Sequence, residues 1–306
     1  MMNGYAAVIG AVNIDMWGRS FAPLIERDSN PGEILISFGG VGRNIAHNMC
    51  LLGMDVSMIT AMGGDMWASR IRESCDQIGI DLSRALCVPE GNTSTYMFIT
   101  GPDGEMSTAV CDANITKHLT PAYLEKNLDF LNAARLVVFD GNLTEEAIEF
   151  LAKRCTAPLF VDPVSVTKAE KIAPYIGHLH TFKPNDIEAM NLTGEDSAEK
   201  AAKALLRKGA KRIFVSDGAR GLVAAEGDTL LRVPCYPTVL RNCTGGGDAV
   251  VAALCRAFCD GLSLEESAKF ALAAGSLAVS CADTINPEMS LSHIQKIISA
   301  GETTIQ

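Results

Sequence analysis

The region from residue 115 to 216 alternates apolar, strand-like runs with helical segments, and this pattern restricts the fold more than any other feature of the sequence. Strands and helices that alternate over such a length pair in parallel and place helices on both faces of the sheet. No repeat, and no linker rich in proline, serine or charge, interrupts the pattern. We therefore predict one α/β domain over residues 1–306, a three-layer sandwich with a mostly parallel central sheet. The expected strands cover 136–140, 159–162, 180–183 and 212–216, and the expected helices lie near 121–134, 144–154, 186–192 and 198–208.

Three consecutive glycines and an aspartate open an apolar helical run at residues 245–248. Gly245, Gly246 and Gly247 lack Cβ atoms, so their backbone can approach a ligand closely. The unpaired N–H groups of a helix start and the helix macrodipole favour an anion there. Asp248 would repel a phosphate unless it has a chemical task, and taking the proton from a hydroxyl that attacks the phosphate is such a task. The alternative is a plain helix cap, since aspartate and glycine are both common before helices.

Polar residues follow the first predicted strand, at 5–12, and a second glycine-rich loop follows later. Asn13 and Asp15 alternate along the chain, so both can face one pocket, although an Asx turn would use the same residues. The loop Gly39-Gly-Val-Gly-Arg-Asn44 leads into a helix that we expect from Ile45. The loop matches neither the Gly-x-Gly-x-x-Gly nor the Walker A pattern, so the sequence does not support a Rossmann or P-loop mechanism.

Three further polar clusters lie where predicted strands end: Asp162-Pro-Val164, Lys183-Pro-Asn-Asp-Ile-Glu188 and Ser216-Asp-Gly-Ala-Arg-Gly221. Asn185 and Glu188 are one helical turn apart, so an amide and a carboxylate could share a water or a Mg²⁺. The alternative for Glu188 is first-turn charge that complements the helix dipole. Ser216 and Gly218 lie either in a ligand loop or in an ordinary turn before a hairpin at 222–231.

Two segments outside the alternating pattern are extended and rich in turn residues. The pattern of residues 16–38 predicts two strands around a turn, and residues 95–100 and 106–110 flank the turn Gly101-Pro-Asp-Gly104. Together they predict a small β-sheet, from about 16–38 and 93–112, outside the main layers. A lid is one use for this sheet, because closing a site keeps water away from a transferring phosphoryl group.

Charge and cysteine content exclude several classes of function. The formal net charge is −10 and no basic patch is present, which argues against nucleic acid and anionic membrane as partners but not against a small anionic ligand. No apolar run reaches the ~18 residues that span a bilayer, and the N-terminus lacks the basic start of a signal peptide. The ten cysteines include no CxxC pair, and neither they nor the five histidines have metal-ligand spacing. We expect a cytoplasmic protein with reduced thiols.

The order of these motifs resembles that of the ribokinase-like (PfkB) carbohydrate kinases. The motifs are Asn13-x-Asp15, Gly39-Gly-Val-Gly-Arg-Asn44, Asn185-x-x-Glu188, Ser216-x-Gly-x-x-Gly221 and Thr244-Gly-Gly-Gly-Asp248, and they cover nearly the whole chain. Within that family the sequence is most similar to the bacterial pseudouridine kinases, on Gly10-Ala-Val-Asn-Ile-Asp15, Ser29-Asn-Pro-Gly32, Gly40-Val-Gly-Arg-Asn-Ile-Ala46, Glu90-Gly-Asn-Thr-Ser94 and Val161-Asp-Pro-Val-Ser165. The resemblance implies a ribokinase-like fold, a β lid, and ATP with Mg²⁺ as the phosphoryl donor.

The resemblance also implies a role for each motif. Asp248 would take the proton from the primary ribose hydroxyl while the amides of Gly245, Gly246 and Gly247 hold the developing charge. The other positions would bind the substrate, the nucleotide with its phosphates, or the metal ion. The substrate set is Asn13, Asp15, Gly40 and Asn44, with Thr93 and Ser94 near the base; the nucleotide set is Asn185, Ser216, Gly218, Gly221 and Thr244; the metal residue is Glu188.

The function that these features favour is ATP-dependent phosphorylation of the 5′ hydroxyl of pseudouridine by direct in-line transfer. A ribokinase or an N-linked nucleoside kinase of the same fold is the nearest alternative, and a nucleoside-binding regulator without catalysis is an alternative of another class. Gly246 stands where alanine is usual, and Asn242 stands where many relatives have an acidic residue that helps to bind a monovalent cation, so we do not predict activation by K⁺. We expect a homodimer that forms through the lid.

Overall fold

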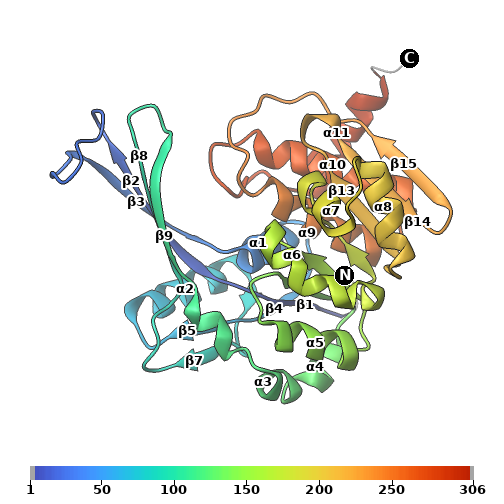
Figure 1. Cartoon of the computed structure of the whole chain (residues 1–306), viewed down its shortest axis with the longest axis horizontal. Helices are drawn as coiled ribbons and strands as arrows, with labels where there is room; N and C mark the ends of the chain where they lie inside the picture. Colours follow the sequence, from blue (N-terminus) through green and yellow to red (C-terminus); the bar gives the residue numbers. More distant parts are fainter. Residues whose placement is uncertain (1–3, 304–306) are drawn as a thin grey trace.

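The computed structural model describes residues 4–303 and places a nine-stranded sheet between two layers of helices (Figure 1). The strand order is β15-β14-β13-β12-β11-β10-β1-β4-β6, and the neighbours from β6 to β13 are all parallel. Only the hairpin strands β14 and β15 extend the sheet in antiparallel fashion. The predicted α/β sandwich is thus confirmed. The strands are β1 (Ala6–Ile9), β4 (Val56–Ile59), β6 (Ile80–Asp81), β10 (Val137–Asp140), β11 (Leu159–Asp162), β12 (Thr181–Phe182), β13 (Arg212–Ser216), β14 (Leu222–Glu226) and β15 (Thr229–Val233).

The central strands are apolar throughout because both faces of the sheet are covered. Alternate residues enter two separate cores: Ala6 and Val8 of β1 pack into one, and Ala7 and Ile9 into the other. The first core lies under α1 (Val41–Leu51), α2 (Met66–Ile78), α9 (Gly246–Cys259), α10 (Leu264–Val279) and α11 (Leu291–Thr303). The second core lies under α3 (Pro121–Glu125), α4 (Leu128–Ala133), α5 (Glu145–Arg154), α6 (Val166–Ile172), α7 (Asp186–Thr193) and α8 (Ala198–Arg207).

The single helix predicted near 121–134 is instead two short helices, α3 and α4, and two further element boundaries differ from the prediction in ways that move candidate site residues. The strand expected at 5–12 ends at Ile9, and a second strand, β2, begins at Asn13. Helix α1 begins at Val41, four residues before Ile45, because Gly40 has a φ of 95° that lets the chain turn directly into the helix. The glycine-rich loop is therefore largely the first turn of α1.

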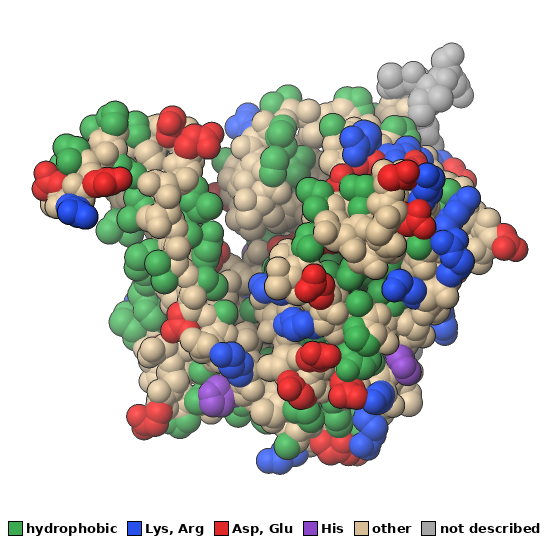
Figure 2. Space-filling model, viewed as in Figure 1, with side chains coloured by type: hydrophobic (Ala, Val, Ile, Leu, Met, Phe, Trp, Pro, Cys, Tyr) green, Lys and Arg blue, Asp and Glu red, His purple; other side chains and the backbone are tan. Residues whose placement is uncertain are grey.

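A second sheet of four strands stands apart from the main body, and we call it the outer sheet. Its strands are β2 (Asn13–Ser20), β3 (Gly32–Gly39), β8 (Thr95–Thr100) and β9 (Met106–Asp112), in the order β3-β2-β8-β9. Strands β2 and β8 are parallel, and the two outer pairs are antiparallel. In Figure 1 the outer sheet projects as a long arm at the left, and Figure 2 shows an open gap between this arm and the body. A third sheet pairs β5 (Ala61–Gly63) with β7 (Leu86–Val88).

The two faces of the outer sheet differ in chemistry. The strand register puts Trp17, Tyr96 and Phe98 on the same face as Asn13 and Asp15, and we call this the aromatic face. The opposite face consists of aliphatic side chains that are 37–76% exposed, and we call it the aliphatic face. Its exposed members are Ile34, Ile36, Met97, Ile99 and Val110.

Candidate active site

Buried charged side chains gather at the carboxyl ends of the parallel strands. Asp140 and Asp162 end β10 and β11 and are paired in register, and Lys183 follows β12. The Lys183 ammonium donates to Asp162 Oδ2 at 3.0 Å, and both side chains are less than 10% exposed. Asp162 and Lys183 were noted in the sequence only as polar strand ends, without a role in the site, and Asp140 was not singled out. Their position at the ends of predicted strands could have identified them as site residues, because ligands of open α/β sheets bind beyond the carboxyl ends of strands.

Asp248 lies in the first turn of α9 and is almost completely buried. Its Oδ2 accepts a hydrogen bond of 2.9 Å from the Asn44 amide of α1, which comes from a position 204 residues away in the chain. Burial, together with the nearby Asp162 charge, raises the pKa of Asp248 to about 8, although Asn44 and Lys183 oppose the shift. A carboxylate with a pKa near neutrality is suited to general base catalysis.

The three glycines before Asp248 have different surroundings. Gly245 is the N-cap residue of α9 with a φ of 81°, and no side chain caps this helix start. This excludes the plain-cap alternative for Asp248. A Cβ on Gly246 would lie 2.9 Å from Val279 in the core, whereas a Cβ on Gly247 would lie 3.0 Å from Lys183 Nζ. Only Gly247 is exposed, so its backbone borders the charged cluster from the solvent side.

Asn13 and Asp15 are the first and third residues of β2, which excludes the Asx-turn alternative. The Ser94 hydroxyl donates to Asn13 Oδ1 at 2.8 Å, which orients the Asn13 amide and leaves its NH₂ group to donate elsewhere. The Asp15 carboxylate packs against Gly39, where a Cβ would lie 2.0 Å from Asp15 Oδ2. Burial raises the pKa of Asp15 to about 6, and Arg43 opposes this shift.

Asn44 joins the two halves of the site and has unused hydrogen-bonding capacity. Its Nδ2 donates to Asp248, while its buried Oδ1 has no partner among the described residues. Buried side-chain oxygens nearly always have a hydrogen-bond partner. Gly40 starts the same helix, and a Cβ on Gly40 would lie 2.5 Å from the Ala11 carbonyl oxygen. Asn44 Oδ1 is therefore an unused acceptor next to Asp248.

Thr93, a predicted site residue, makes its hydrogen bonds within the protein. Its hydroxyl donates to Asp65 Oδ1 at 2.8 Å and accepts from the Gly63 amide at 3.0 Å, and its own amide donates to Asp65 Oδ2 at 2.7 Å. Asp65 in turn caps α2. The hydroxyl and amide of Thr93 are thus engaged within the protein, and its contact with the substrate stays a prediction. Ser94 is 1% exposed and bonds to Asn13, so it orients a candidate ligand group.

Asn185 and Glu188 are joined by a capping box at the start of α7. The Glu188 amide donates to Asn185 Oδ1, and Glu188 Oε2 accepts from the Asn185 amide, both at 2.8 Å. Burial raises the pKa of Glu188, partly opposed by the bond from the Asn185 amide. The capping box leaves Glu188 Oε1 available. Within residues 4–303 no three His, Cys, Asp or Glu side chains form a metal-ligand set, so a Mg²⁺ here would depend on water and phosphate oxygens, which Mg²⁺ commonly uses.

The loop after β13 is rigid and lies beside α7. Ser216 forms an isolated parallel bridge with Asn185. Gly218 has a φ of 53° with open space around its Cβ position, whereas a Cβ on Gly221 would lie 2.0 Å from the Val233 carbonyl oxygen. Buried Asp217 fixes this loop through ion pairs with two arginines, Arg220 and Arg232. The structure thus brings together Ser216 and Asn185 from two predicted motifs.

Thr244 and Asn242 link the glycine tract to the segment after α10. Thr244 is exposed, and its amide donates to Asn242 Oδ1 at 2.9 Å. Asn242 Nδ2 donates to the Ala282 carbonyl at 2.9 Å. Asn242, which departs from the family pattern, therefore joins the loop before α9 to the segment after α10.

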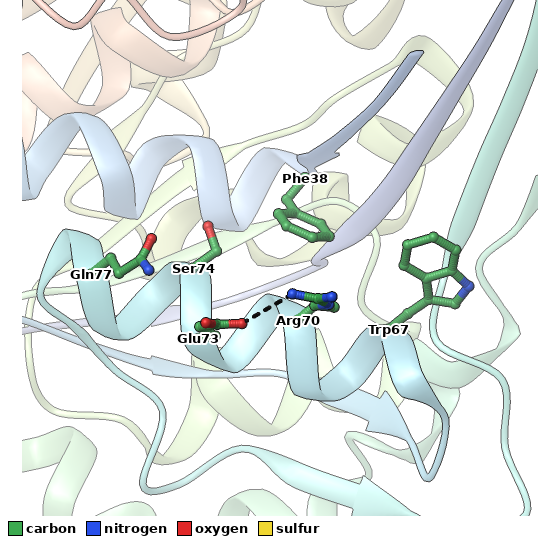
Figure 3. Close-up of a pocket in the computed structure, with 6 residues that line it drawn as sticks. All are labelled: Phe38, Trp67, Arg70, Glu73, Ser74 and Gln77. Atoms are coloured by element: carbon green, nitrogen blue, oxygen red, sulfur yellow. Dashed lines mark ion pairs between the residues drawn. The ribbon is translucent and has the colours of Figure 1, made fainter. Parts of the chain in front are cut away.

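A pocket of about 390 Å³ lies away from these residues, between the base of β3 and α2 (Figure 3). The Arg70–Glu73 ion pair, with a nitrogen–oxygen distance of 3.5 Å, runs along its α2 wall. None of its lining residues belongs to the candidate site. The lining residues are Phe38, Trp67, Arg70, Glu73, Ser74 and Gln77.

Comparisons with known proteins place most of the chain within one family. Residues 3–290 match the model of the pfkB family of carbohydrate kinases. The pseudouridine kinase of Escherichia coli K12 is 36% identical over 306 residues, covering 97% of both chains. The uncharacterized sugar kinase YeiI of the same organism is 33% identical, covering 96% of this chain and 83% of its own.

Solved structures agree with this result. A putative sugar kinase from Clostridium perfringens superposes with a TM-score of 0.88 at 30% identity, over 98% of this chain and 97% of its own. Arabidopsis thaliana ribokinase complexed with ribose and ATP superposes with a TM-score of 0.84 at 20% identity, over 97% of this chain and 99% of its own. The second likeness shows the fold alone.

Proposed function

The chain belongs to the pfkB family of carbohydrate kinases, and from this membership we propose that it phosphorylates the primary ribose hydroxyl of pseudouridine. It is an ATP-dependent sugar or nucleoside kinase, and kinases of this family use ATP. The choice of pseudouridine rests on the 36% identity to the E. coli pseudouridine kinase over nearly the whole chain. Within residues 4–303 no helix is long and apolar enough to cross a membrane.

The observation that carries the proposed chemistry is the pair formed by Asn44 and Asp248. Asn44 Oδ1 is a buried acceptor without a partner, and it lies on the side chain that also bonds to Asp248 Oδ2. A primary hydroxyl that donates to one of these oxygens lies within reach of the other. Asn13 and Asp15 supply further polar groups for the sugar from β2. These four residues suit a ribosyl substrate whose reactive hydroxyl reaches Asp248.

In this proposal Asp248 takes the proton as the hydroxyl attacks the phosphoryl group. Its raised pKa gives it enough basicity, and Asn44 keeps the carboxylate oriented. The amide of Gly247 and the Lys183 ammonium border the place where negative charge develops. ATP with Mg²⁺ supplies the phosphoryl group, and Glu188 Oε1 with Asn185 is the side of the site that would meet the hydrated ion.

We also propose that the outer sheet closes over the site as a lid and joins two copies of the chain. Ile34, Val110 and their neighbours on the aliphatic face are too exposed for a face without a partner. A two-fold pairing of this face with itself would cover it. Ile34→Lys with Val110→Lys should convert a dimer to a monomer by light scattering, and a monomeric wild type would refute the dimer. The ten free cysteines fit a reducing cytoplasm.

The decisive experiment is a panel of nucleosides and sugars with ATP, monitored by ADP release. Pseudouridine should be the preferred acceptor, and Asp248→Asn should be inactive on every acceptor. Preference for free ribose or for an N-linked nucleoside would identify a different kinase of the same family. ADP release that depended on no acceptor would leave a nucleoside-binding regulator, which would overturn the proposed catalytic function.

A further inference from the structure

Three aromatic rings form a stripe along the outer sheet on the face that also carries Asn13 and Asp15. We propose that this stripe, formed by Trp17, Tyr96 and Phe98, is the platform on which the planar base of a nucleoside stacks. The stripe then makes the enzyme select nucleosides over free sugars. This inference rests on the proposed function, because it requires a ribosyl group at the neighbouring polar residues.

The three rings pack against one another along the outer sheet. The Trp17 and Phe98 ring centroids are 6.2 Å apart with an interplanar angle of 8°, and Tyr96 lies 5.5 Å from Phe98 at 32°. A hydrogen bond of 2.8 Å from Trp17 Nε1 to Thr100 Oγ1 fixes the indole. All three rings are partly exposed. The rings are therefore held in place without a ligand, which lowers the entropic cost of binding a planar group against them.

The strand register places the stripe at a suitable distance from the sugar residues. Asp15 of β2 is the direct neighbour of Tyr96 on β8, and Trp17 is the direct neighbour of Phe98. Successive residues on one face of a strand are about 6.6 Å apart. A ribose held at Asp15, with its primary hydroxyl directed to Asp248, would put its base over the first or second aromatic row.

The contrast along β8 argues against a purely structural reason for the rings. Residues 96–99 alternate aromatic and aliphatic, so Tyr96 and Phe98 face the side of Asp15 while Met97 and Ile99 face the other side. Both aromatic rings of β8 therefore lie on the side of Asp15. Aromatic stacking accepts any base because every base has a π-face. The stripe therefore selects the class of substrate, and it does not distinguish pseudouridine from uridine.

The test compares Tyr96→Leu and Phe98→Leu with the matched control Met97→Leu, which lies between them on the opposite face. Stacking on one aromatic ring is worth ~1–3 kcal/mol, so kcat/KM for the preferred nucleoside should fall roughly 5- to 150-fold in the first two variants. The kcat/KM for free ribose should stay the same in all three, and Met97→Leu should keep the wild-type ratio. A nucleoside-to-ribose ratio that is unchanged in Tyr96→Leu and Phe98→Leu would overturn the inference.

Tryptophan emission gives a second readout that does not depend on turnover. The chain has two tryptophans, so Trp67→Phe leaves Trp17 as the sole emitter. Pseudouridine should change the Trp17 emission and ribose should not; an emission that is unchanged at saturating nucleoside would contradict stacking. A wild type that bound and phosphorylated only free sugars would overturn both the proposed function and this inference. Nucleoside turnover without any effect of the stripe variants would overturn this inference alone.

Discussion

Replacing Asp248 with asparagine should abolish turnover and at the same time stabilise the fold. Asparagine still offers an oxygen to the Asn44 amide, which donates to Asp248 at 2.9 Å, so the site should keep its shape. The amide cannot accept the proton of the substrate hydroxyl. Since a positioned general base contributes ~10²–10⁴-fold, the rate should fall by about that factor.

The gain in stability follows from the difference in pKa between the folded and unfolded chains. Burial raises the pKa of Asp248 from 3.8 to about 8, so the folded protein keeps this proton over a pH range in which the unfolded chain loses it. The stability that the protonated group provides is complete below pH 4 and is lost progressively as the pH rises to about 8. One unit corresponds to about 1.4 kcal/mol, so at pH 7 the wild type should be about 4 kcal/mol less stable than the asparagine variant.

Denaturant unfolding of both proteins at pH 4.5, 7 and 8.5 measures this difference, and ADP release measures turnover. The free energies of unfolding should differ by only about 1 kcal/mol at pH 4.5 and should separate further in favour of Asp248→Asn toward pH 8.5. A constant difference across this range would refute a raised pKa of Asp248. Turnover close to that of the wild type would remove Asp248 from the role of base.

The other predictions concern its neighbours. Gly247→Ala should lower turnover by ~10²–10³-fold at an unchanged thermal midpoint, because the new Cβ would lie 3.0 Å from Lys183 Nζ and obstruct the adjacent amide; normal turnover would make the glycine a mere loop residue. Asp15→Ala should raise KM for the nucleoside roughly 10- to 150-fold, the equivalent of ~1.5–3 kcal/mol, and leave KM for ATP unchanged; equal nucleoside KM values would remove Asp15 from the sugar site. Asp162→Asn should destabilise the protein by ~3–5 kcal/mol because it leaves buried Lys183 without its counter-charge, and an unshifted denaturation midpoint would contradict this. The kcat/KM of the wild type should rise about tenfold per pH unit up to about pH 8, and a flat profile would speak against ionisation of Asp248.

The layered fold was predictable because strands buried on both faces leave a plain pattern in the sequence. Val8 and Ile9 are both apolar in the sequence, yet they pack into opposite cores. The apolar run therefore predicts the strand but not which core each residue enters. The exact ends were less visible. The residue types at 5–12 do not indicate that the strand of the main sheet ends at Ile9 and that a strand of the outer sheet begins at Asn13.

Site residues were predictable where the backbone conformation requires a particular residue type. They were less predictable where contacts between distant parts of the chain determine a side chain's role. The backbone before α9 has a φ of 81°, which favours glycine, so Gly245 could be recognised from the sequence. The bond from Thr93 to Asp65 was not predictable, because a threonine hydroxyl looks the same in sequence whether it contacts a ligand or a helix-capping residue 28 positions away. Asp162 and Lys183 were visible as polar strand ends, but their ion pair depends on the neighbourhood of β11 and β12.

The parallel pairing of β2 with β8 has a consequence for how the molecule is made. Ile14 pairs with Thr95, and the chain between them includes α1, β4, β5, α2, β6 and β7, so the centre of the outer sheet can close only after this whole segment has been made. Closing so long a segment costs entropy before any contact is gained. During synthesis β2 and β3 must therefore wait for β8 with their apolar side chains uncovered. The arm should be the last part of the molecule to fold and the first to exchange its amide protons.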